Sequence, residues 1–189
     1  MKRRSLLAAV MIALLAGPVL AAPKTLPKLT LTDLDGKRHK IEEFTGQGPL
    51  LINFWATYCK PCLAEMPKLQ AFHEEWEPAG FQVLAISIDP PRTSKQVKPF
   101  VHRQGIKFPV YLDSNSEVHR KLGGRAVPYN VLVGIGGDIL STSMGYKDSD
   151  AEKWAKLIET DLAAHGRSLP GDESVPDSAD SDHEENKGD

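Results

Sequence analysis

Apolar residues along this 189-residue chain change their spacing from segment to segment. Nearly continuous apolar runs predict strands buried on both faces, whereas apolar positions three and four residues apart predict helices. The first pattern occupies residues 50–54 and 81–88, and the second occupies residues 61–76, where Pro67 is expected to kink the helix. Weaker versions of these patterns predict further strands at 29–32, 38–41, 108–112, 129–135 and 139–144, and further helices at 93–104, 116–122 and 151–164.

The order of these elements indicates the fold class. Turn residues at 35–36 and 136–138 join neighbouring strands into hairpins near the two ends of the pattern. Between the hairpins, strands alternate with helices, which predicts an α/β architecture with a mixed central sheet flanked by helices. The patterned segment, residues 26–164, suits one domain with one core.

The N-terminal residues 1–21 have the composition of a signal peptide. Basic residues 2–4 precede an apolar run of ten residues, 6–15, and Gly17-Pro18 ends that run before a small-residue cleavage site at Ala21. The run is short for a transmembrane helix, which needs about 20 residues, so cleavage is favoured over an uncleaved anchor. We therefore expect a periplasmic or otherwise exported protein, and the choice between the general and the twin-arginine route stays open.

The opposite end is strongly acidic. Residues 166–189 contain eight acids against two bases and few large apolar side chains, which predicts a disordered acidic tail. The whole chain has a formal net charge of −2, and no basic, aromatic-rich segment indicates a nucleic-acid partner. We expect a monomer.

Two cysteines, Cys59 and Cys62, are the only ones in the chain. They stand between the predicted strand 50–54 and helix 61–76, where a helix N-terminus favours a thiolate. A zinc site would need a second pair of ligands, and the six histidines lack the spacing for one. A structural disulfide with so short a loop would restrict the unfolded chain little. The pair therefore predicts a redox-active dithiol.

The motif around these cysteines resembles a known family, the TlpA/ResA-type thioredoxin-fold disulfide reductases. The resemblance is carried by the sequence Phe-Trp-Ala-Thr-Tyr-Cys-Lys-Pro-Cys at 54–62, by Glu-Met-Pro at 65–67 and by Val-Pro at 127–128, and it spans residues 26–164. It implies a thioredoxin-like fold with two additions: an N-terminal β-hairpin and a central αβ insertion within residues 89–128.

The resemblance also implies roles for individual residues. Cys59 would be the exposed attacking thiol and Cys62 the resolving thiol, so the redox-active disulfide replaces any cofactor or metal. Val127-Pro128 resembles the family's cis-proline element, which pairs with an extended substrate. Tyr58 and Trp55, close to the first cysteine, are expected to contact the substrate.

Glu65 is the candidate for proton transfer. It follows Cys62 by three residues and so lies on the same helical face. The alternative is a surface glutamate paired with Lys68. In thioredoxin itself, the position that matches Asn53 is a buried acid that serves the resolving cysteine. Because this chain has an asparagine there, the case for Glu65 is stronger.

The expected direction of electron flow is reduction of the client. Lys60-Pro61 separates the cysteines, without the histidine seen in strong oxidants, so the disulfide should be weakly oxidising. The resemblance implies protein disulfide substrates, such as the Cys-x-x-Cys-His site of an apocytochrome c. It also implies a membrane thiol-transfer partner as electron donor.

Two other classes share this fold. Peroxiredoxin-like peroxidases have a threonine three residues before their reactive cysteine, whereas this chain has Ala56 at that position. Copper-binding metallochaperones of this fold have a wider cysteine spacing and a distant histidine ligand. His119 is the conceivable ligand here, but its polar neighbours predict a solvated surface residue.

Overall fold

The computed structural model describes residues 24–171, so the predicted signal peptide and most of the predicted acidic tail lie outside the described residues. The strands are β1 (Thr30–Asp33), β2 (Arg38–Lys40), β3 (Leu50–Trp55), β4 (Gln82–Ser87), β5 (Val110–Leu112), β6 (Tyr129–Val133) and β7 (Ile139–Met144). The helices are α1 (Lys60–Trp76), α2 (Val97–Gln104), α3 (Glu117–Lys121) and α4 (Ser149–Ala164), with short 3-10 turns η1 (Ile41–Glu43), η2 (Glu77–Ala79) and η3 (Ser94–Gln96). Every predicted strand and helix is present, with its ends moved by a few residues.

The seven strands form one mixed sheet in the order β2-β1-β5-β4-β3-β6-β7. Strand β4 runs parallel to both β3 and β5, whereas the pairs at the two ends of the sheet are antiparallel. The hairpin β1–β2 joins the sheet through β5, the strand from the predicted insertion. The insertion therefore widens the sheet at the side where the N-terminal hairpin attaches.

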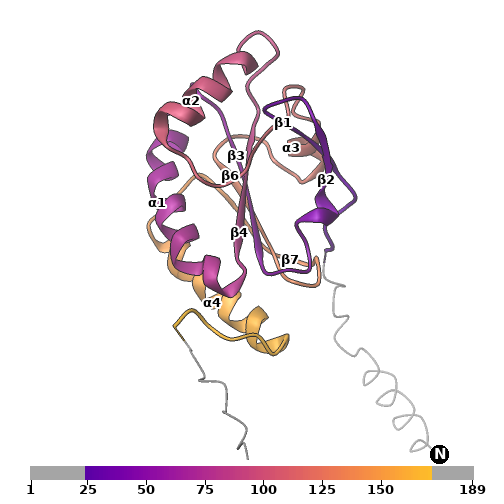
Figure 1. The fold of residues 1–189 in the computed structure, drawn as a ribbon, viewed down its shortest axis with the longest axis vertical. Helices are drawn as coiled ribbons and strands as arrows, with labels where there is room; N and C mark the ends of the chain where they lie inside the picture. The colour runs from indigo at the N-terminus through magenta and orange to yellow at the C-terminus, as the bar shows by residue number, and fades with distance from the viewer. Residues whose placement is uncertain (1–23, 172–189) are drawn as a thin grey trace, which may run out of the picture.

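Each face of the sheet packs against a separate hydrophobic core. Strand β3 is buried along its whole length, and its alternate side chains enter the two cores. Leu51 and Trp55 point toward the core shared with α1, α2 and α4, on the left in Figure 1. Ile52 and Phe54 point toward the core under the β1–β2 hairpin and α3. This alternation places Asn53 on the α1 face.

Helix α1 begins immediately after the strand–loop segment that carries the cysteines. Cys59 is its N-cap, and Pro61 occupies the first turn. Backbone N–H groups in the first turn have no partner within the helix, so the N–H that proline lacks is not needed there. The helix continues through Pro67 and ends at η2, followed by Gly80 with φ of +84°. A left-handed backbone of this kind favours glycine.

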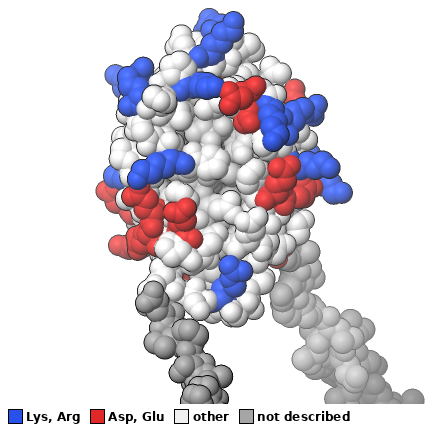
Figure 2. All heavy atoms as spheres, in the orientation of Figure 1, with Lys and Arg blue, Asp and Glu red and all other residues white. Residues whose placement is uncertain are grey.

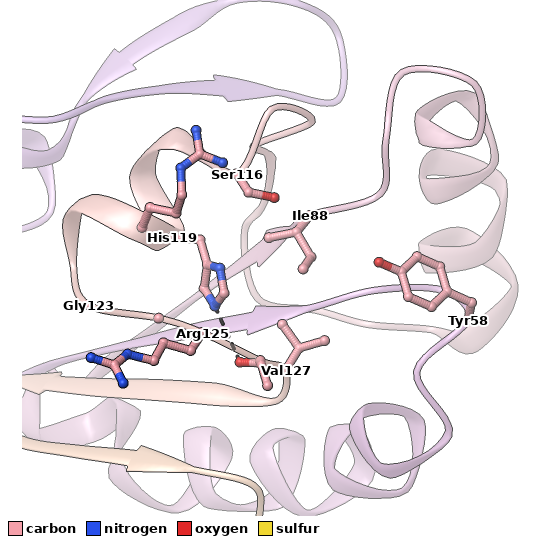
Figure 3. A pocket seen from close by; sticks show the side chains of 10 residues that line it. Tyr58, Ile88, Ser116, His119, Gly123, Arg125 and Val127 are labelled. Carbon is pink, nitrogen blue, oxygen red and sulfur yellow. Dashed lines mark hydrogen bonds between the residues drawn. The ribbon is translucent and has the colours of Figure 1, made fainter.

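The end of the sheet where β3 and β4 finish is hollowed. The register pairs Trp55 with Ser87 and Phe54 with Tyr129, so the segments that follow β3 and β4 and precede β6 meet there. A cavity of about 810 Å³ lies at this end (Figure 3). Basic and acidic side chains are interspersed around the face shown in Figure 2. Among residues 24–171, no helix has the length and apolar character needed to cross a membrane.

Candidate active site at the N-terminus of helix α1

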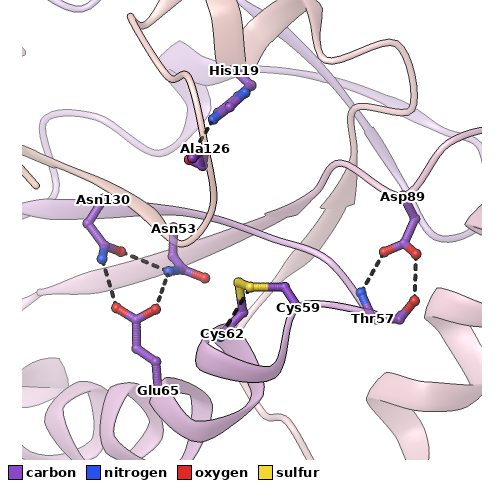
Figure 4. Close-up of a disulfide and its surroundings, with 9 residues drawn as sticks. All are labelled: Asn53, Thr57, Cys59, Cys62, Glu65, Asp89, His119, Ala126 and Asn130. Atoms are coloured by element: carbon purple, nitrogen blue, oxygen red, sulfur yellow. Dashed lines mark hydrogen bonds between the residues drawn. A yellow bond between two sulfur atoms is a disulfide. The ribbon is translucent and has the colours of Figure 1, made fainter. Parts of the chain in front are cut away.

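The two cysteines form a disulfide at the N-terminus of α1 (Figure 4). Their sulfurs are 2.08 Å apart and their Cα atoms 5.3 Å apart. The backbone N–H of Cys62 points at Cys59 Sγ from 3.3 Å. In the reduced protein, this N–H and the helix dipole would favour negative charge on Cys59.

Cys59 is more buried than the sequence indicated. Cys59 is 8% exposed and Cys62 is 0% exposed, although Cys59 was expected to be an exposed thiol. Cys59 is the more exposed of the two cysteines, as expected, but its exposed fraction is much smaller than expected. As N-cap of α1, Cys59 lies where the chain turns out of the sheet, and both cysteines belong to the hydrophobic core on the α1 face.

The loop before Cys59 is held by a carboxylate that sequence reasoning missed. Asp89 is fully buried and accepts hydrogen bonds from the Thr57 backbone N–H at 2.9 Å and from the Thr57 hydroxyl. Ser87 Oγ donates to the same carboxylate at 2.8 Å. Asp89 follows the apolar run of β4, so its position at the end of a strand next to β3 was the available signal. It fixes the loop that leads into Cys59.

Glu65 lies inside the protein, between α1 and the sheet. It is 1% exposed, which corrects the alternative of a surface pair with Lys68; that lysine instead pairs with Asp148. Asn130 Nδ2 donates to Glu65 Oε1 at 2.7 Å, and Asn53 Nδ2 contacts Oε2 at 3.3 Å.

The two asparagines are direct partners across the β3–β6 ladder, and Asn53 Nδ2 also donates to Asn130 Oδ1 at 2.8 Å. Figure 4 shows the Glu65 carboxylate facing both amides. We call Asn53, Glu65 and Asn130 the polar triad.

Burial dominates the proton affinity of Glu65. It raises the pKa of the carboxyl from 4.5 to about 7, while the hydrogen bonds from Asn130 and Asn53 oppose the rise. A buried carboxyl group with such a pKa can both accept and release a proton near neutral pH. It lies one helical turn beyond Cys62 on the same helix.

The segment immediately before β6 contains the cis peptide bond Val127-Pro128, as predicted. Within residues 24–171, neither the N–H nor the C=O of Val127 enters a backbone hydrogen bond. Tyr58, beside Cys59, is 61% exposed.

Trp55 differs from its expected role. Its side chain is 0% exposed, and its ring packs on Phe100 with centroids 5.5 Å apart. A side chain without exposed surface cannot touch a docked substrate, so the predicted substrate contact is corrected. The strand alternation directs Trp55 into the core beneath the site.

His119 is also placed differently from the expectation. It is 5% exposed, and its ring packs against Phe54 at 5.0 Å and Tyr129 at 5.7 Å between centroids. Its Nε2 lies 3.3 Å from the carbonyl oxygen of Ala126, so Nε2 is the protonated nitrogen of the neutral ring. Burial lowers the pKa of His119, which keeps the ring neutral at pH 7. The polar neighbours of His119 in the sequence predicted a surface residue. Phe54 and Tyr129, which bury it, are distant in the sequence and approach α3 only in the folded protein.

Comparison with known proteins agrees with this geometry. The model of the AhpC/TSA family matches residues 23–140. The thiol-disulfide oxidoreductase ResA of Bacillus thuringiensis subsp. konkukian is 32% identical over 136 residues, which cover 71% of this chain and 77% of that relative. The chain belongs to the ResA-type thiol-disulfide oxidoreductases of the AhpC/TSA family.

Solved structures show the same fold. An uncharacterised thioredoxin-like protein from Porphyromonas gingivalis is 31% identical with a TM-score of 0.61, covering 71% of this chain and 92% of that chain. StoA from Bacillus subtilis, at 19% identity and a TM-score of 0.55, covers 70% of this chain and 99% of its own. The predicted α/β, thioredoxin-like fold and the predicted family are therefore confirmed.

Proposed function

We propose that the chain is a protein-disulfide reductase that works by dithiol–disulfide exchange through Cys59 and Cys62. The observation that carries this proposal is the hydrogen bond from the Cys62 N–H to Cys59 Sγ at the start of α1. It distinguishes the two sulfurs chemically, because among residues 24–171 only Cys59 Sγ receives a hydrogen-bond donor suited to a thiolate. The disulfide itself accepts and delivers the electrons, so the exchange needs no cofactor.

The reaction transfers two electrons and two protons to the client. The thiolate of reduced Cys59 attacks one sulfur of a client disulfide; a Cys59–client bond forms, and the client's other sulfur leaves and takes a proton. Cys62 then loses its proton and attacks Cys59 Sγ. The Cys59–Cys62 disulfide forms, and the second client sulfur leaves as a thiol.

Glu65 is the group we assign to the proton of Cys62. Its pKa of about 7 suits a base that must accept a thiol proton and release it to the departing client sulfur. With Glu65 ionised, both asparagine amides of the triad donate to the carboxylate. When it is neutral, its O–H needs an acceptor, and the buried Asn53 Oδ1 has no partner among residues 24–171. Rotation of the amides would provide one.

The client is expected to lie along Val127, whose N–H and C=O are free for strand-like pairing. Tyr58 supplies an exposed aromatic surface next to the attacking sulfur. Together they support a polypeptide substrate, which needs backbone pairing and a contact surface.

The direction and the setting of the reaction complete the proposal. Lys60 and Pro61 between the cysteines, with no histidine, favour a reductant. The apolar run near the N-terminus supports action outside the cytoplasm, where a membrane thiol-transfer protein would return electrons to Cys59–Cys62. An apocytochrome c, with a Cys-x-x-Cys-His site that must be reduced before haem attachment, is one client of this kind.

The proposal is tested by turnover and by trapping. The wild-type protein should reduce insulin disulfides in the presence of dithiothreitol, and Cys59→Ser should abolish that activity. Cys62→Ser should accumulate a mixed disulfide at Cys59, visible by mass spectrometry. The two variants control for each other, because both remove one sulfur and only one should trap the client. Trapping on neither variant, or hydrogen peroxide turnover without insulin reduction, would contradict the proposal.

Copper binding is the remaining alternative. Among residues 24–171, no group of three or more His, Cys, Asp and Glu side chains is arranged to hold a metal ion, and the His119 ring is engaged with Ala126. Tight Cu(I) binding without disulfide turnover would favour that alternative.

A further inference from the structure

The cavity beside the disulfide has two different ends. Tyr58 and Val127 line it near the active site, and Figure 3 shows Arg125 farther away. Arg120, which follows His119 in α3, lines the cavity as well. His119 lies between them. With a volume of about 810 Å³, the cavity can take several side chains of a bound polypeptide. None of the functional roles described so far uses the end with the two arginines.

The walls of the cavity are held by close packing. A Cβ added to Gly124 would lie 2.1 Å from the His119 ring, so the loop that leads to Val127 rests directly on that ring. The hydrogen bond of His119 to Ala126 fixes the next part of the same loop. The backbone N–H of His119 is in turn bonded to buried Asp113 at 2.8 Å. The cavity is thus shaped before a ligand arrives, which lowers the entropic cost of binding.

The charged side chains that line the cavity are both basic. Its lining includes two arginines and no aspartate or glutamate. Both arginines are exposed, and within residues 24–171 neither forms an ion pair. Arg120 uses Nη1 to bond the Asn115 carbonyl at 2.8 Å, which orients its guanidinium without neutralising it. Guanidinium groups match carboxylates in geometry and charge.

We propose that this cavity binds an acidic side chain of the client, within a few residues of the cysteine that Cys59 attacks. The inference rests on the proposed function and adds a preference among clients. A client chain that pairs with Val127 and leads its cysteine to Cys59 passes along the cavity, because Tyr58 and Val127 form its near end. A client carboxylate there meets Arg120 and Arg125, whereas a client lysine is repelled.

The test is a competition between peptides for Cys59. Peptides with one cysteine, and with Glu, Gln or Lys at each of the four positions on either side, compete as disulfides for the full-length Cys62→Ser protein. Mass spectrometry measures the ratio of the trapped products. At one or more positions, the Glu peptide should be favoured over the Gln peptide by about threefold to tenfold at low salt, and less at 0.5 M NaCl.

Charge variants of the cavity separate the inference from intrinsic thiol reactivity. The double variant Arg120→Gln/Arg125→Gln should lose the preference, and Arg125→Glu should shift it toward the Lys peptide. Arg92→Gln, on an exposed residue outside the cavity, is the matched control and should keep the wild-type ratio. Equal trapping of Glu and Gln peptides by wild type, or an unchanged preference in the double variant, would overturn the inference. Failure to trap any peptide would instead overturn the proposed function.

Discussion

Two regions next to the Cys59–Cys62 disulfide differ in how they handle charge. The polar triad places a carboxyl group inside the protein, bonded to two amides that face each other across the β3–β6 ladder. The rim of the cavity places Arg120 and Arg125 at the surface, in contact with solvent. Burial makes the energy of the first region large and dependent on pH, whereas water and salt weaken the second. We assign the movement of a proton to the first region and the selection among clients to the second.

The largest effect is expected from Glu65→Gln. The pKa of Glu65 is raised in the folded protein, from 4.5 to about 7, so the wild type loses stability as the pH rises through this interval. The loss is complete above pH 7 and amounts to about 3 kcal/mol. The variant has no titrating group at position 65. Its free energy of unfolding should therefore exceed that of the wild type by up to this amount at pH 8, and the two values should match near pH 4.

Urea unfolding of the oxidised proteins between pH 4 and pH 8 measures this difference. The same variant should resolve mixed disulfides more slowly, which a purely structural residue would not do. Parallel stability curves for the two proteins across this range would show that Glu65 does not titrate as described.

A smaller effect is expected from Asn130→Ala. This variant removes the 2.7 Å hydrogen bond to the buried carboxylate, and bonds to charged groups contribute about 2 kcal/mol. The loss of stability should be greater at pH 8 than at pH 4, because only the ionised carboxylate needs the donor strongly. The pKa of Glu65 should rise further. In the Glu65→Gln background, the pH dependence of the loss should disappear; its persistence would mean that Asn130 acts on another group.

Gly124→Ala tests the packing that shapes the cavity. The new methyl group would overlap the His119 ring, so the loop or the ring must move, at about 1 to 3 kcal/mol. Gly136→Ala is the matched control, since its added Cβ would meet only atoms at 3.8 Å and beyond. Thermal unfolding of both variants measures the difference in stability. Equal stability of the two variants would indicate that the His119 ring moves aside without loss of stability.

The smallest effect on stability is expected from Arg125→Gln. Because the side chain is exposed and unpaired within residues 24–171, Tm should change by less than about 2 °C. Its effect should instead appear in the ratio of trapped acidic and neutral peptides. A large loss of stability would place Arg125 in the structure of the fold rather than in client selection.

Local patterns were sufficient for the elements and for the cysteine pair. The apolar run of β3 and the helical spacing of α1 are properties of adjacent residues, so the strand–Cys-x-x-Cys–helix unit could be predicted. The cis bond before Pro128 followed from the family resemblance and is confirmed.

The rest depends on contacts between distant segments. Asn53 and Asn130 are 77 residues apart in sequence, and only the register of β3 with β6 makes them neighbours. His119 has charged neighbours in sequence but apolar ones in space. Trp55 lies close to the active cysteine in sequence, yet the alternation of β3 turns its side chain into the core. Sequence distance to a motif was thus a poor guide to contact with a substrate.

The reduction potential of the Cys59–Cys62 couple tests the central claim most directly. It can be measured by equilibrating the full-length protein with glutathione or dithiothreitol buffers and quantifying the free thiols. A reductase should give a value below about −200 mV, toward the −270 mV of thioredoxin. A value close to −120 mV, typical of a strong oxidant, would contradict the account and reverse the direction of electron flow.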